Sequence, residues 1–479
     1  MTAHRHASPA RSGLGRAYRE QLAREGVRIE ELNRDAAASR LLRITYPGEF
    51  LPTPVFVSAA ERAALLRDGE TVHRLLTELP DRLFGGDPGA LAEAVGLTEV
   101  QARLASRAAA GPPPLRLARS DVYRDAEGFK LLEMNISSAL GGAEIATLNR
   151  AMLGHPALAR FTAEHGLGYV DTLQHFAATV RAACGGPHRT PVVALAEWPE
   201  TFADYELWLH VTASLLEDVG IECVPCHVGE LADRPGRLEA RGRPVDAVVR
   251  FFLLDEIRTP QKAALLEPLL RAVDAGTVRL LSRMDTELYG NKGTLALLSD
   301  DRHRALCTPA ERDCLDRFLP WTHFVRPVLR LPDGSTAGLE RYARAEQPDL
   351  VLKPVLSHRG IGTVPGWTVP AATWLDRVRR AVGGPYVLQR RVVPTAEAFP
   401  APDGGTREVY LNWGVFLTDP SATGSDGYGG CYIRASDDPG IGVIRTGPST
   451  KYACAFHEED SAAAAPRVRP VHATGRPGF

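Results

Sequence analysis

The sequence predicts a mixed α/β protein, and three observations indicate this class. Apolar residues recur with a helical period over much of residues 16–110. Strand and helix patterns alternate within residues 191–280, which is typical of a parallel sheet. Beyond these residues the pattern becomes α+β, with several strands and few helices. We therefore expect a helical N-terminal region, then a parallel sheet, then a second sheet-containing region.

Changes in composition divide the chain into six expected segments. Residues 1–15 and 458–479 are low in large apolar side chains, which is typical of disordered tails. The segments between them are a helical region (16–114), a hairpin with helices (115–190), a Rossmann-like subdomain (191–280) and an α+β region (281–457).

Periodicity also predicts the individual elements in order. Apolar residues three or four apart predict helices over residues 18–22, 59–79, 90–109, 143–153, 170–183, 204–219, 261–275 and 371–382. Short apolar runs predict strands over residues 191–196, 221–227, 245–252, 349–354, 385–391, 408–416 and 430–436. Gly111–Pro114 ends the third helix, because proline cannot continue one. No Gly-rich dinucleotide fingerprint follows the strand at 191–196, so neither a nicotinamide nor a flavin site is expected.

Composition excludes several classes of protein. The chain has 479 residues, 44% hydrophobic and 24% charged, which is ordinary for a globular protein. A net charge of −2 gives no field that would recruit nucleic acid or a membrane surface. No apolar run approaches the roughly 18 residues of a membrane span, and residues 1–16 lack the apolar core of a secretory signal. We expect a cytoplasmic protein.

The cysteines do not predict a disulfide framework, because the seven are odd in number and widely scattered. Cys223 and Cys226 have the CxxC spacing of redox and zinc motifs. They fall in an expected strand, with neither a helix start after them nor a second cysteine pair. A structural role is therefore favoured for both.

A β-hairpin over residues 119–135 is the most informative expected element. Its turn is residues 126–128, and three-residue hairpin loops favour a glycine at the last position, as here. Side chains alternate between the two faces of a strand. Counting from this turn makes one face apolar, with the side chains of Val122, Leu132 and Met134.

The opposite face of the hairpin is charged and polar. The same register places Asp121 opposite Glu133 and Arg119 opposite Asn135. Like charges directly across two strands are destabilising, so a positive group is expected beside the carboxylates. Arg119 or a divalent cation would serve, and Mg²⁺ prefers oxygen ligands together with phosphate. A surface cluster of arginine and carboxylates is the alternative.

A loop rich in serine and glycine follows the hairpin. It contains Ser137, Ser138, Gly141 and Gly142 and leads into an expected helix. Backbone N–H groups in such a loop can bind an anion. Paired carboxylates beside an anion-binding loop are typical of a site that handles phosphate.

Lysine is rare, with only five among 56 basic residues, so the position of each is informative. Lys292 follows Asn291, a good helix N-cap, and a cation in the first turn is disfavoured unless an anion is bound. A solvated lysine is the alternative. Lys353 ends an apolar strand, and the loop after it contains Gly360 and Gly362. A lysine on a strand with a glycine loop can hold nucleotide phosphates.

Two further positions give weaker signals. Gln389 lies in an expected strand whose backbone could contact an adenine. Arg434 extends from a Gly-rich strand, where it could stabilise charge on a phosphoryl or tetrahedral centre. A surface salt bridge is the alternative for Arg434.

In this order, the motifs resemble those of the ATP-grasp ligases, specifically the circularly permuted branch typified by glutathionylspermidine synthase and trypanothione synthetase. The resemblance covers about residues 115–457. It rests on Arg119 with Asp121, Glu133 with Asn135, Asn291–Lys292, Lys353–Pro354 with its glycine loop, Gln389 and Arg434. Each motif alone is common, whereas the ordered set is specific.

The resemblance implies an ATP-grasp fold that binds ATP and Mg²⁺. The implied metal ligands are Asp121, Glu133 and Asn135. The implied ATP contacts are Lys292, Lys353, Gly360, Gly362 and Gln389. The residues implied to bind the reacting carboxylate or its acyl phosphate are Arg119, Arg434, Ser137 and Ser138. Glutathionylspermidine synthases often carry an amidase domain before the ligase, but the first cysteine here is Cys184, so no amidase activity is expected.

The implied function is an ATP-dependent carboxylate–amine ligase that forms an amide through an acyl phosphate. Its substrates would be a small carboxylate and an amine, such as an amino acid, a small peptide or a polyamine. A small-molecule kinase and a nucleotide-binding protein without turnover are alternatives on the same fold. The sequence leaves a homodimer open.

Overall fold

A computed structural model describes residues 13–110, 115–185, 190–358, 360–401, 403–438, 440, 444 and 446–459. Most of the two expected tails, and the helix end expected at Gly111–Pro114, lie outside the described residues. Some of the described tail residues belong to regular elements. Helix α1 (Leu14–Glu25) already includes Leu14, and strand β22 (Lys451–Glu458) includes Glu458.

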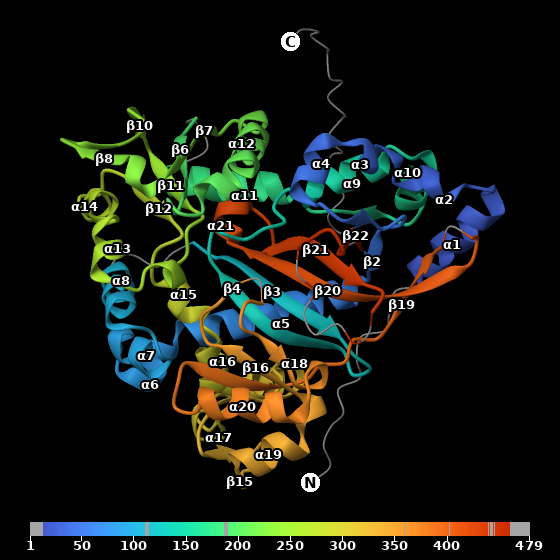
Figure 1. Ribbon diagram of the computed structural model, residues 1–479. Coiled ribbons are helices and arrows are strands. Elements are labelled where there is room, and N and C mark those ends of the chain that lie inside the picture. Colours follow the sequence, from blue (N-terminus) through green and yellow to red (C-terminus); the bar gives the residue numbers. More distant parts are fainter. Residues whose placement is uncertain are drawn as a thin grey trace.

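A nine-stranded sheet forms the centre of the molecule (Figure 1). Its main path runs from β1 (Glu49–Phe50) through β22, β21 (Tyr428–Ser436), β20 (Thr406–Thr418) and β3 (Leu117–Arg124) to β4 (Phe129–Ile136). The other members are β19 (Glu397–Pro400), which pairs with β20, and β2 (Val55–Val57) and β5 (Leu167–Gly168), which pair with β22. The expected hairpin is therefore joined to strands that lie almost 300 residues later in the chain.

A second, fully parallel sheet has the order β12 (Arg279–Leu281), β11 (Ala247–Arg250), β6 (Val192–Glu197) and β7 (Glu222–His227). The parallel pairing predicted for the strands between residues 191 and 252 is confirmed. Alternate side chains of β6 pack to opposite sides. Leu195 joins the cluster that includes helix α12 (Phe202–Asp218), and Ala194 joins the cluster that includes α14 (Glu267–Asp274).

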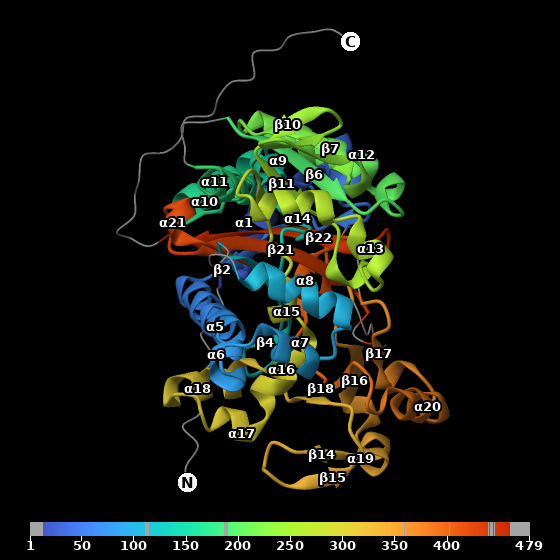
Figure 2. The ribbon, with the colours of Figure 1, turned by 90° about the vertical axis from the view of Figure 1, so that its left-hand side faces the viewer.

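The third large sheet is antiparallel, with the order β13 (Thr322–Phe324), β18 (Tyr386–Arg390), β16 (Leu350–Pro354) and β17 (Val364–Pro365). Helix α20 (Ala371–Ala381) covers it, and the buried Trp374 packs with Leu352 and Leu388. Figure 2 shows the resulting levels, with the parallel sheet at the top, the central sheet below it and the antiparallel sheet at the bottom.

The remaining elements surround these sheets. The other helices before the parallel sheet are α2 (Ile29–Leu32), α3 (Arg34–Ala38), α4 (Arg40–Thr45), α5 (Ala59–Thr77), α6 (Leu79–Phe84), α7 (Pro88–Ala94), α8 (Glu99–Ala109), α9 (Ile145–Leu153), α10 (Pro156–Glu164) and α11 (Thr172–Ala183). The other helices that follow strand β11 in the chain are α13 (Pro260–Ala264), α15 (Thr286–Tyr289), α16 (Lys292–Ser299), α17 (Asp301–Arg304), α18 (Pro309–Phe318), α19 (Leu339–Ala345) and α21 (Pro420–Thr423). One small sheet contains β8 (Leu231–Arg234), β9 (Arg237–Ala240) and β10 (Arg243–Val245). Another contains β14 (Val328–Arg330) and β15 (Thr336–Gly338).

Three expectations about these elements need correction. The helix expected over residues 90–109 is two helices, α7 and α8, because Gly96 between them has a positive φ of 81°, which ends the first. The helix expected over residues 261–275 is two helices, α13 and α14, because Pro268 in the first turn of α14 lacks the N–H that a continuous helix requires. The N-terminal region is not purely helical, since β1 and β2 join the central sheet through β22. Among the helices described, none combines the length and apolar character needed to cross a membrane.

The cysteines at 223 and 226 behave as predicted for structural residues. Both lie in β7 and are buried. Burial raises the pKa of each thiol to about 12. Because the thiolate is the form that binds metal or reacts, neither residue is suited to zinc or redox chemistry near neutral pH.

Candidate active site

A cavity of about 540 Å³ lies where the three large sheets meet. The central sheet contributes Asp121 and Arg434, the antiparallel sheet Lys353 and Gln389, and the parallel sheet Glu197. The other predicted site residues on its wall are Arg119, Glu133, Asn135, Ser137, Lys292 and Gly360. The structure therefore brings together ten of the twelve residues that the sequence predicted, leaving out only Ser138 and Gly362.

The hairpin has the predicted register at the carboxylates. Asp121 pairs with Glu133, and Arg119 pairs with Asn135. The predicted turn is wrong by one residue, because Arg124 pairs with Phe129 and a four-residue turn separates them. A β-bulge next to Asp121 leaves Leu132 without a partner and restores the register.

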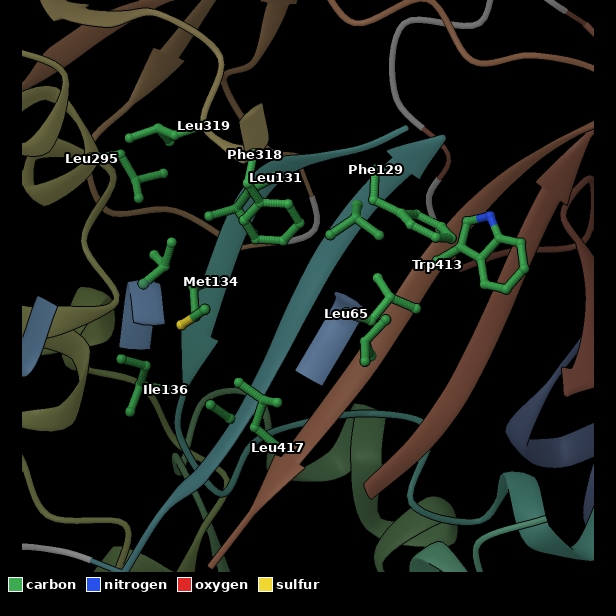
Figure 3. Packing of buried hydrophobic residues seen from close by; sticks show 14 of the residues in the cluster. Leu65, Phe129, Leu131, Met134, Ile136, Leu295, Phe318, Leu319, Trp413 and Leu417 are labelled. Carbon is green, nitrogen blue, oxygen red and sulfur yellow. The ribbon is translucent and has the colours of Figure 1, made fainter. Parts of the chain in front are cut away.

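The bulge changes which leucine of β4 enters the core. Leu131, Met134 and Ile136 are all buried in one cluster, packed near Leu65 of α5 and Leu295 of α16 (Figure 3). Residues three apart share a face of a strand only if an irregularity lies between them. The predicted apolar position at Leu132 is therefore wrong, and Leu132 instead lines the cavity.

Two arginines bind the Asp121 carboxylate. Arg119 donates from Nε to Oδ1 at 2.7 Å, and from Nη2 to Oδ2 at 3.3 Å. Arg434 donates from Nη2 to Oδ2 at 2.6 Å and to the amide oxygen of Asn412 at 2.6 Å. The side chains of Arg434 and Asp121 are only 12% and 5% exposed, so their charges are weakly screened. The alternative of a surface cluster does not describe these residues.

A glycine provides the space for this arrangement. Gly414 lies on β20 between Asp121 on β3 and Tyr432 on β21. A Cβ atom at Gly414 would lie 2.9 Å from Cδ of Arg119 and 3.1 Å from the carbonyl oxygen of Tyr432. The guanidinium of Arg119 also lies 5.8 Å from the centre of the Tyr432 ring.

Glu133 pairs with the lysine at the start of α16. Nζ of Lys292 lies 3.0 Å from Oε2 of Glu133. The Asn291 side chain caps the helix by accepting from the N–H of Gly293 at 2.7 Å, as predicted. Burial would raise the pKa of Glu133, but the charges of Lys292 and Lys353 outweigh it and hold the pKa at about 2. Lys292 is 7% exposed, so the solvated alternative is wrong.

Lys353 lies close enough to Glu133 for each charge to shift the pKa of the other side chain. Its Nζ donates to the amide oxygen of Gln389 at 2.6 Å and to the carbonyl oxygen of Leu132, the bulged residue, at 3.2 Å. Gln389 in turn donates to the hydroxyl of Thr322 at 3.1 Å. Burial lowers the pKa of Lys353 to about 8, with Lys292 adding to the effect and Glu133 opposing it.

Residues of the glycine loop after Lys353 line the cavity. Nζ of Lys292 donates to the carbonyl oxygen of Ser357 at 3.2 Å. Gly360 and Gly362 both have positive φ, at 66° and 74°. Gly360 is on the cavity wall, whereas Gly362 packs over Pro354, where an added Cβ atom would lie 2.7 Å from the proline ring.

The two serines after the hairpin have different surroundings. Ser137 lines the cavity, and its hydroxyl accepts from the N–H of Ala139 at 3.0 Å. Ser138 is 2% exposed, and its hydroxyl donates toward the carbonyl oxygens of Arg250 and Leu281 at 2.6 and 2.8 Å. Its N–H donates to the hydroxyl of Ser282 at 2.9 Å. Ser138 therefore joins the loop to the ends of β11 and β12.

The cluster of charged side chains around Asp121 and Glu133 favours the binding of a polyanion. In this cluster, four cationic side chains, those of Arg119, Lys292, Lys353 and Arg434, accompany the two carboxylates of Asp121 and Glu133. Further carboxylates line the cavity outside the cluster. Within the part of the chain that the structure describes, no cluster of three or more His, Cys, Asp or Glu residues could hold a metal ion. The oxygen donors of Asp121, Glu133 and Asn135 suit Mg²⁺ in type, but the excess positive charge requires phosphate oxygens to accompany the ion.

Sequence reasoning missed several residues of the cavity wall. Tyr46 comes from the N-terminal region and Glu144 from the start of α9. Gly414 of β20, which was also missed, packs against Arg119 rather than lining the cavity. Glu144 directly follows the serine and glycine loop, so its position beside an expected anion site was an available signal. Tyr46 reaches the cavity only through the tertiary fold, and no local pattern marks it.

Comparison with known proteins gives a resemblance of fold only. No protein-family model matches the chain, and no curated protein sequence does. A glutathione synthetase-like effector from Globodera pallida, solved in its apo form, matches with a TM-score of 0.52 and 13% identity. The match covers 94% of this chain and 99% of that one. A candidate gamma-glutamylcysteine synthetase from Methylobacillus flagellatus KT matches over 84% of this chain and 89% of that one, at 13% identity and a TM-score of 0.39. That second similarity is too distant to support an argument.

Proposed function

We propose that this chain is an ATP-dependent ligase that joins a carboxylate to an amine on a circularly permuted ATP-grasp fold. One observation carries the proposal. Four buried or half-buried cations form one cluster with only two carboxylates and an amide, at the part of the cavity wall formed by the central sheet, the antiparallel sheet and helix α16. This excess of positive charge suits a nucleoside triphosphate. The fold shared with a glutathione synthetase-like protein supports the same reading.

The nucleotide would lie between the antiparallel sheet and the central sheet. Lys292 and Lys353 would hold its phosphates, since both ammonium groups are already directed into the cavity with Glu133 between them. Gln389 would lie at the adenine end. Mg²⁺ held by Asp121, Glu133 and Asn135 would neutralise phosphate charge during transfer.

The carboxylate substrate would bind beside Arg119 and Arg434. One of its oxygens attacks the γ-phosphorus of ATP. The bond between the γ-phosphorus and the oxygen that bridges it to the β-phosphorus breaks, and ADP leaves. The resulting acyl phosphate reacts with an amine, and inorganic phosphate leaves. Arginines beside the reacting carboxylate stabilise the charge that develops in both steps. The glycine loop after Lys353 would exclude water from the acyl phosphate.

The test is a screen for ADP release with pools of acids and amines. We expect ADP and phosphate to form together only when both an acid and an amine are present. Lys292→Met should lower the rate by about 10²-fold or more, because a buried phosphate contact is lost. Lys262→Met is the matched control, since that lysine is half-exposed on α13 and should have no effect.

Other outcomes of the screen would exclude the ligase. A small-molecule kinase would release ADP without inorganic phosphate. A binding protein without turnover would bind ATP and release no ADP with any pool.

A further inference from the structure

Two buried side chains in the cavity wall each have one polar atom without a hydrogen-bond partner among the described residues. Glu144 is 2% exposed, and its Oε2 atom has no partner among the described residues. Tyr46 is 1% exposed, and its hydroxyl also has no hydrogen-bond partner among the described residues. Both residues line the cavity. Because unpaired buried polar atoms are costly, such a pair in a cavity wall indicates a ligand.

The two side chains are connected to the proposed carboxylate site. Arg119 donates from Nη1 to the carbonyl oxygen of Gly141 at 2.6 Å, which fixes the loop that leads to Glu144. The Tyr46 ring lies 5.7 Å from the ring of Tyr432, and the Arg119 guanidinium lies over that same ring. Burial is the largest cause that raises the pKa of Tyr46, and the charge of Glu144 is the next largest.

The surroundings of Glu144 suit a group that takes up a proton. Burial raises the pKa of its carboxyl, although the backbone N–H groups of Gly142 and Glu144 and the side chains of Thr212 and Trp208 oppose the shift. The Thr212 hydroxyl lies 3.5 Å from Oε1, which leaves Oε2 for another donor. A carboxylate of raised pKa accepts a proton more readily than an exposed one.

An aromatic wall adjoins these two residues. Trp208 and Phe251 lie edge to face, with ring centres 5.0 Å apart, and both line the cavity together with Tyr205. Aromatic faces bind carbon skeletons and also attract cations.

We propose that Glu144 and Tyr46 bind the amine substrate, with Glu144 as the base and the aromatic wall holding an apolar or aromatic carbon skeleton. This proposal rests on the proposed ligase function and names the second substrate of the same site. The substrate class is a primary amine, bound as its ammonium ion.

The proton transfers balance as follows. Glu144 takes one proton from the ammonium group and leaves a neutral amine. The nitrogen lone pair attacks the carbonyl carbon of the acyl phosphate, the C–N bond forms, and the C–O bond to phosphate breaks. The departing phosphate takes the second proton from nitrogen. The products are an amide, hydrogen phosphate and a protonated Glu144.

Isothermal titration with benzylamine tests the binding step without needing the natural substrates. Benzyl alcohol, of nearly the same shape but uncharged, is the comparison probe. The variants are Glu144→Gln and Tyr46→Phe. Glu206→Gln is the matched control, because Glu206 is an exposed carboxylate of α12 that does not line the cavity. A non-hydrolysable ATP analogue is titrated into every variant to check that the site is folded.

We expect wild type to bind benzylamine more tightly than benzyl alcohol. Glu144→Gln should weaken benzylamine binding about tenfold or more, as loss of a charge-assisted hydrogen bond requires. Tyr46→Phe should weaken benzylamine binding less, and Glu206→Gln should not change it. Affinity for the ATP analogue should be unchanged throughout.

Three results would overturn the amine site: no binding of benzylamine to wild type, unchanged binding in Glu144→Gln, or an equal loss in Glu206→Gln. Failure of the proposed ligase function would look different. In that case the ATP analogue would not bind wild type, whatever the amine did.

Discussion

Arg434 of β21 donates a hydrogen bond of 2.6 Å to Asp121 of β3, although strand β20 lies between them. Arg119 binds the same carboxylate from its own strand. The carboxylate is therefore the shared hydrogen-bond partner of two buried guanidinium groups. We infer that Asp121 supports the structure of the site as well as its chemistry.

Asp121→Asn should consequently cost stability as well as activity. The change leaves two buried arginines with a neutral partner, and we expect the free energy of unfolding to fall by about 3 kcal/mol. Glu133→Gln should abolish turnover with a smaller loss of stability, because the Glu133 side chain is 28% exposed. Urea denaturation and ADP release measure the two effects. Near-normal turnover in both variants would contradict the metal assignment.

Gly414→Ala should displace Arg119, because the new methyl group would lie 2.9 Å from its Cδ atom. We expect a loss of about 10²-fold in kcat/KM for the carboxylate, as small displacements of a catalytic group can cause. Gly338→Ala is the control, since nothing lies within 4 Å of its Cβ position and its φ is −67°. Equal activity in the two variants would show that Arg119 has room to move.

The pH dependence of nucleotide binding should report on Lys353. Its pKa of about 8 lies below that of an ordinary lysine, so its positive charge is lost as the pH rises through 8. We expect the affinity for an ATP analogue to fall by about tenfold between roughly pH 7 and pH 9, with proton uptake on binding in the upper part of that range. Calorimetry in buffers of different ionisation enthalpy measures the uptake.

Lys353→Arg provides the matched comparison for that titration. Arginine stays charged over this whole range. The variant should therefore bind with an affinity that is nearly independent of pH. A slope equal to that of wild type would assign the dependence to another group.

Ser137→Ala and Ser138→Ala should have different effects. Ser138→Ala removes buried hydrogen bonds to β11 and β12 and should lower the free energy of unfolding by about 2 kcal/mol, with little change in KM. Ser137→Ala should change KM for the carboxylate with little change in stability. Thermal unfolding and steady-state kinetics separate the two. A raised KM in Ser138→Ala alone would restore its predicted substrate role.

Local patterns predicted much of the fold and of the candidate site. The facing of Asp121 and Glu133 follows from the alternation of side chains, and the cap at Asn291 follows from residue type. The parallel strands between residues 191 and 252 follow from the alternation of strands and helices.

What the sequence did not predict depends on contacts between distant segments. The bulge at Leu132 is stabilised by packing of Leu131 in the core and exposes a carbonyl to Lys353, which is more than 200 residues away. The strands β1 and β2 are short and gain their hydrogen bonds from β22 near the other end of the chain. The space over Gly414 is set by Arg119, which no pattern around residue 414 indicates.

Transfer of oxygen from the carboxylate to phosphate tests the central claim most directly. A pool of amino acids with ¹⁸O in their carboxyl groups is incubated with the protein, MgATP and an amine pool, and the phosphate is analysed by mass spectrometry. Formation of an acyl phosphate predicts one ¹⁸O atom in the inorganic phosphate, in amounts that match the ADP released. Unlabelled phosphate, or label in AMP, would contradict the account.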